Sequence, residues 1–104
     1  MSFNIEAVIG DMLNAVKNSV GASWGDIESY AKQVFENEKE TLQDLAEQRL
    51  RGELTDEELE SELEDEKDTV EAELKAIQVM TKVMAQKAAN AAMDVLFKAI
   101  KAAI

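Results

Sequence analysis

The sequence predicts an all-α protein, and three observations support this fold class. The 104 residues contain no proline, so nothing in the chain removes the backbone N–H that a long helix needs. Aromatic residues make up only 5% of the chain, so its core must be aliphatic and alanine-based. Apolar residues also recur at helical spacing. We expect a single domain over residues 1–104, built as a long antiparallel helical hairpin plus a short N-terminal helix.

The first helix is predicted over residues 3–20. Its apolar residues follow the i, i+3, i+4 and i+7 spacing of a helix with one buried face: Ile5, Val8, Ile9, Met12, Leu13, Val16 and Val20. Two glycines within residues 21–25 then predict a turn. Ser23 is the expected N-cap of the helix that follows.

The second helix is predicted over residues 24–51. Gly52 supplies a stop signal, and Arg49 and Arg51 lie in the last turn, where the helix dipole favours cations. The apolar stripe of this helix is interrupted by Glu38 and comprises Ile27, Ala31, Val34, Phe35, Leu42, Leu45 and Leu50. The short connection after Gly52 predicts that the next helix folds back on this one.

The third helix is predicted over residues 56–103. Thr55 and Glu58 have the spacing of a capping box, with Leu54 and Leu59 at the positions of a hydrophobic staple. Residues from Leu63 to Ala91 repeat every seven positions, which is typical of coiled-coil packing in a bundle. A break near residues 88–90 is the alternative to one continuous helix.

Charge is distributed unevenly along the chain, whose net charge is −11. Residues 36–73 hold 17 acidic and four basic residues, whereas residues 74–104 hold five lysines and one aspartate. The C-terminal segment is apolar over most of its circumference, and such a helix is normally buried on several sides. We therefore expect a homo-oligomer, a dimer or larger, with an interface formed by Ile77, Met84, Ala88, Ala91, Ala92, Val95, Leu96 and Ala99. An unknown protein partner is the alternative.

Residue types that are missing exclude several kinds of chemistry. The chain has no cysteine and no histidine, which removes thiol catalysis, disulfides, Cys-ligated metals and the commonest near-neutral acid–base group. We expect no enzymatic activity and no cofactor. The acidic surface argues against nucleic acid as a partner. The N-terminus does not resemble a secretory signal, and no stretch of about 18 apolar residues predicts a membrane span, so we expect a cytoplasmic protein.

The leading hypothesis is a non-enzymatic helical interaction or structural protein that self-assembles through its apolar C-terminal half. A carboxylate-rich, ferritin-like metal-binding bundle is the first alternative. Its candidate ligands are Glu36, Glu40, Glu62 and Glu66, with Glu38 and Glu66 lying nearest the apolar stripes. A solvated helix face is the simpler interpretation of these acids. The second alternative is peripheral membrane association through the lysine-bearing, apolar residues 77–104.

Overall fold

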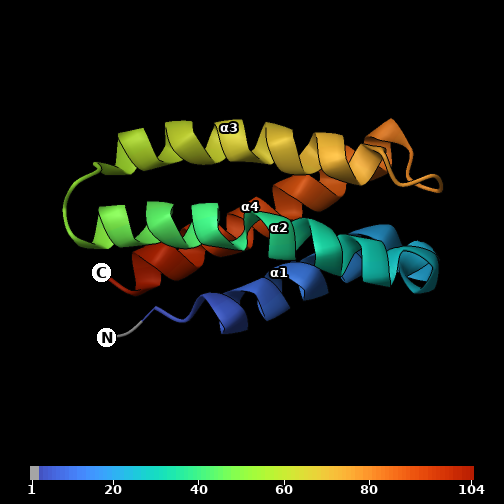
Figure 1. Ribbon diagram of the computed structural model, residues 1–104, viewed down its shortest axis with the longest axis horizontal. Helices are drawn as coiled ribbons and strands as arrows, with labels where there is room; N and C mark the ends of the chain where they lie inside the picture. The colour runs from blue at the N-terminus through green and yellow to red at the C-terminus, as the bar shows by residue number, and fades with distance from the viewer. Residues whose placement is uncertain (1–2) are drawn as a thin grey trace.

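A computed structural model describes residues 3–104 and confirms the all-α class. The elements are α1 (Ile5–Val20), a short 3-10 turn η1 (Gly21–Ser23), α2 (Trp24–Leu50), α3 (Asp56–Lys75) and α4 (Lys82–Ala102). Successive helices run in opposite directions (Figure 1). Within the described residues, the chain is therefore an up-down-up-down bundle of four α-helices.

The four helices pack in a ring in which each helix packs mainly against two neighbours, and α2 also contacts α4 across the bundle. The N-terminal α1 packs against α2 and α4, and α3 packs against the same two helices from the other side. The predicted antiparallel hairpin is formed by α2 and α3. The bundle measures 40 × 22 × 19 Å along its principal axes. Its core is aliphatic apart from Phe35, and it includes Met12, Ile27, Leu42, Leu59, Leu74 and Leu96.

The start of α1 and the turn into α2 differ in detail from the prediction. Asn4 is the N-cap of α1, and its Oδ1 accepts a hydrogen bond of 3.2 Å from the N–H of Ala7. Gly21 adopts a positive φ of 60°, a conformation that favours glycine. Ser23 stands at the expected N-cap position of α2, but its side chain makes no capping bond. Its backbone is already helical, because η1 continues directly into α2.

The connection between α2 and α3 follows the predicted local chemistry. Gly52 has a φ of 79°, and its N–H donates to the carbonyl of Arg49, while the N–H of Glu53 donates to the carbonyl of Gln48. These two bonds form a Schellman motif, which satisfies carbonyls at the end of α2. Arg49 Nε also lies 2.8 Å from Asp56 Oδ1, so an ion pair joins the two helix ends.

The capping box at the start of α3 is present. Thr55 Oγ1 accepts from the N–H of Glu58 at 3.1 Å, and Glu58 Oε1 accepts from the N–H of Thr55 at 2.9 Å. We expect Thr55→Ala to lower the free energy of unfolding by about 1 kcal/mol, because a helix-end N–H loses its acceptor. Urea denaturation measures this loss.

Thr69→Ala is the matched control for the cap. Thr69 lies in the same helix, is exposed, and bonds only back to the carbonyl of Asp65. Its replacement should change the free energy of unfolding by less than about 0.5 kcal/mol. Equal losses in the two variants would contradict a specific role for the Thr55 cap.

One continuous helix over residues 56–103 is wrong, and so is the alternative break near residues 88–90, which lie inside α4. The chain leaves α3 after Lys75, turns through residues 76–81 and restarts at Lys82. Thr81 is the N-cap of α4, and its Oγ1 accepts from the N–H of Met84 at 3.1 Å. A straight helix of this length would reach about 70 Å, far beyond α1 and α2. The turn instead lets α4 fold back between α1 and α3.

Small side chains on α4 allow this close return. Ala85, Ala88, Ala89 and Ala92 are all fully buried. The distance between packed helices depends on the side chains at the contact, so alanines permit the backbones to approach closely. The apolar C-terminal half is therefore largely covered by helices of its own chain.

Candidate functional site

A groove lies in the described surface between α2 and the connection that joins α3 to α4. Its volume is about 850 Å³, within the usual range for ligand pockets. The apolar part of the lining is formed by Val34 of α2 and by Ala76, Ile77 and Val79 of the connection. The turn after α3 thus creates this groove, which we call the α2 groove.

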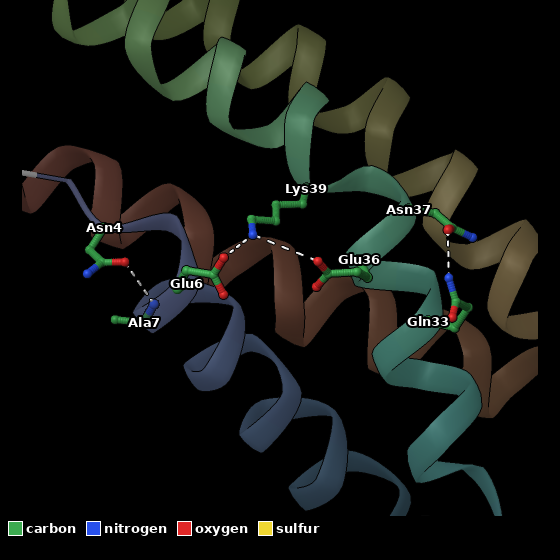
Figure 2. A network of polar contacts seen from close by, with 7 residues as sticks. All are labelled: Asn4, Glu6, Ala7, Gln33, Glu36, Asn37 and Lys39. Carbon is green, nitrogen blue, oxygen red and sulfur yellow. Dashed lines mark hydrogen bonds and ion pairs between the residues drawn. The ribbon is translucent and has the colours of Figure 1, made fainter.

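The polar rim of the α2 groove carries acids and amides but neither lysine nor arginine. Along α2, the lining residues Asp26, Tyr30, Gln33 and Asn37 lie on one face of the helix, at the spacing of successive turns. Gln33 Nε2 donates to Asn37 Oδ1 at 2.9 Å (Figure 2). Glu73 contributes a carboxyl group from α3.

Two large side chains of the groove remain exposed. Tyr30 is 60% exposed and Val79 is 48% exposed. Val83, in the first turn of α4, is 58% exposed but does not line the groove. Clustered exposed apolar groups beside a groove are typical of a binding surface, whereas single ones are common on any protein.

A carboxyl cluster lies between α2 and α3, next to the groove. It comprises Glu38 of α2 and Glu66 and Glu73 of α3. The pKa of Glu66 is raised to about 7, first by burial and then by the neighbouring carboxyls of Glu38 and Glu73. Burial likewise raises the pKa of Glu73 to about 7, with Glu38 as the second cause. Near neutral pH, these two carboxyls are therefore partly protonated.

The candidate metal ligands predicted from sequence do not come together. Glu36, Glu40 and Glu62 are exposed, whereas Glu66 is half-buried. Glu36 lies 3.8 Å from Lys39, which also pairs with Glu6 of α1 (Figure 2). Among residues 3–104, no group of three or more acidic side chains is arranged to hold a metal ion. Oε2 of Glu66 is shielded from solvent and has no hydrogen-bond partner in the described part of the chain.

The eight residues of the predicted subunit interface differ in how deeply the chain itself buries them. Ala88, Ala92 and Leu96 are fully buried among the helices of their own chain, and their contact with another subunit stays a prediction. They are covered because α4 packs against both α1 and α3. The other five residues are half-buried, and only Ile77 lines the α2 groove; the remaining four are Met84, Ala91, Val95 and Ala99.

The C-terminal lysines are exposed and partly paired within the chain. Lys98 lies 2.9 Å from Asp94, and Lys101 lies 3.8 Å from Asp56 and 5.4 Å from the centre of the Phe97 ring. None of the helices in residues 3–104 combines the length and apolarity that crossing a bilayer requires.

Sequence reasoning missed the α2 groove because it treated residues 76–81 as helix. The available signal was Thr81, a preferred N-cap residue that opens the α4 segment. Sequence reasoning did single out Glu38 and Glu66, the two glutamates nearest the apolar stripes, and the structure brings them together. Glu73 had no comparable signal, since it is one of many acids in α3.

These features define the class of this protein as an antiparallel four-helix bundle with an apolar, acid-rimmed groove on its surface. Comparison with known proteins finds no matching family, curated protein or solved structure.

Proposed function

We propose that this chain is a non-enzymatic interaction protein that binds another protein through the α2 groove. The observation that carries the proposal is the exposure of Tyr30 and Val79 beside an apolar groove, in a bundle that otherwise buries most of its large apolar residues. Burying such groups against a partner would be favourable at about 25 cal/mol per Å². Helical bundles commonly bind ligands between their helices.

Absent residue types support a non-enzymatic role. With neither cysteine nor histidine, the chain has no thiol or imidazole to act as nucleophile or general base. The carboxyls with raised pKa values belong mainly to the packing between α2 and α3, where Glu38 acts on both Glu66 and Glu73.

Another protein suits the groove better than a second copy of this chain. The net charge of −11 makes two copies repel each other, and the groove rim is itself acidic. The self-assembly expected from the sequence relied on the C-terminal apolar face, much of which is covered by α1 and α3.

A pair of valine variants tests the proposal. Random 16-residue peptides displayed on phage are selected against the folded protein, and binders are then measured against Val79→Asp and Val83→Asp. We expect a set of peptides whose affinity falls at least about tenfold on Val79→Asp, because a charge replaces an apolar contact in the groove. Binding by the same peptides should be unchanged by Val83→Asp.

Val83→Asp is a matched control because both valines are about half exposed and only Val79 lines the groove. Circular dichroism checks that both variants retain the helical fold. The proposal fails if no selected peptide distinguishes the two variants.

A further inference from the structure

We propose that the α2 groove binds a basic amphipathic helix of a partner protein, with the apolar face of that helix in the groove and its lysine or arginine side chains beside Asp26 and Glu73. This inference rests on the proposed function and adds the chemistry of the partner. It is carried by two independent features of the groove, its charge and its length.

The charge of the rim selects a cationic partner. Asp26 lies in the first turn of α2, and Glu73 lies in the last turns of α3, so the two walls of the groove each carry a carboxyl group. No lysine or arginine lines the groove to neutralise them. Complementary charge at a binding surface speeds association and disfavours partners of the wrong sign.

The length of the groove suits a helix. Its α2 wall extends from Asp26 to Asn37, which corresponds to about 16 Å along the helix axis. This distance spans about three turns, so a helical partner could place side chains at i, i+4 and i+7 against it. Tyr30 remains exposed at the middle of this wall and offers a broad contact for one apolar anchor.

The protonation of Glu73 predicts that binding of the partner helix depends on pH. Its pKa of about 7 is raised first by burial and then by Glu38 of α2; Glu66, in the same helix, belongs to the same cluster. A lysine or arginine brought near Glu73 favours its ionised form. Binding should therefore release a proton and become stronger as the pH rises from about 6 to 8.

Peptide selection tests the chemistry of the partner without choosing it in advance. The displayed library of random 16-residue peptides is first depleted on the Val79→Asp protein and then selected on the native protein. Val79→Asp keeps every native acidic group and adds one more carboxylate to the groove, so peptides that bind through charge alone still bind the variant and are removed by depletion. We expect the surviving peptides to be enriched in lysine and arginine, with apolar residues at i, i+3 or i+4 and i+7.

Charge variants then test the contact itself by isothermal titration with a synthesised survivor. Asp26→Asn combined with Glu73→Gln should weaken binding about tenfold at low salt and remove most of its pH dependence. The control combines Glu57→Gln with Asp68→Asn, which removes the same charge from exposed positions outside the groove. This control should bind within about twofold of the native protein.

The outcomes separate the inference from the function on which it rests. Groove-dependent peptides without enrichment in lysine and arginine, or binding insensitive to the Asp26 and Glu73 changes, would overturn the basic helix and leave the interaction function standing. No groove-dependent peptide at all would overturn both. Light scattering measures the native mass. If the native protein is a dimer and Val79→Asp is a monomer, the groove binds a second copy of this chain, and the inference is overturned.

Discussion

Replacing Phe35 by alanine is expected to lower the free energy of unfolding by about 3–5 kcal/mol, a large fraction of the stability of a small domain. Phe35 is fully buried and is the largest such side chain in the described core. It lies on α2, which packs against α1 and α3. Alanine would leave a cavity where the ring packs, and close-packed helices relax only partly into such a space.

Urea denaturation of Phe35→Ala and Tyr30→Ala measures this effect with an internal control. Tyr30 is an aromatic residue of the same helix, but it is 60% exposed. Its replacement should cost less than about 1 kcal/mol, because little of its ring leaves water on folding. Similar losses in the two variants would contradict the placement of Phe35 in the core.

The second large effect is a fall in stability between pH 5 and pH 8. Glu66 and Glu73 have pKa values of about 7 in the folded chain, above the ordinary glutamate value of 4.5. The folded state therefore binds these protons more tightly than the unfolded state does. The resulting stability is fully present below pH 4.5 and is lost as the pH rises through 7. We expect a total loss of about 1–2 kcal/mol, since both side chains retain contact with water.

Two other acidic groups change the free energy of unfolding in the opposite direction, and they do so at lower pH. Arg49 lowers the pKa of Asp56, and Arg51 lowers that of Glu53. Their contributions are present above the unfolded pKa and are lost only as the pH falls through the lower folded values. Between pH 5 and pH 8, Asp56 and Glu53 are therefore mostly ionised in both states, and the raised pKa values of Glu66 and Glu73 dominate the pH dependence of stability.

Glu66→Gln tests whether the carboxyl cluster causes the pH dependence of stability. An amide has the shape of the protonated carboxyl but cannot ionise, so this variant should reduce the pH dependence of stability. It should also be more stable than the native protein by about 1 kcal/mol at pH 8, with little difference at pH 5.

Glu62→Gln is the control, because Glu62 lies one turn away in the same helix and is exposed. The free energy of unfolding of Glu62→Gln should depend on pH in the same way as that of the native protein. An unchanged pH dependence in Glu66→Gln, measured by urea denaturation at five or more pH values, would show that the cluster is not responsible.

Local features of the fold were predictable from the sequence because they depend on residues a few positions apart. The capping box of Thr55 and Glu58 and the glycine stop at Gly52 need only short-range hydrogen bonds and one residue with positive φ. The hairpin of α2 and α3 follows from these two signals. Apolar spacing likewise indicated which faces of α1 and α2 enter the core.

The position of α4 depended on the tertiary structure. Heptad spacing continues across residues 76–81, so periodicity alone favoured one long helix. Folding back through residues 76–81 lets α1 and α3 cover the apolar face that the sequence assigned to another subunit. The free energy gained by this burial depends on contacts between distant segments, which a local pattern does not describe.

The sequence by itself determined the helical class, the α2–α3 turn and the acidic character of this protein, because composition and short-range spacing are sufficient for each. Only the tertiary structure decided where α4 packs, which glutamates meet, and that residues 76–79 complete a groove with α2. Each of these depends on the relative register of helices, and that register is set by side-chain packing across the whole bundle.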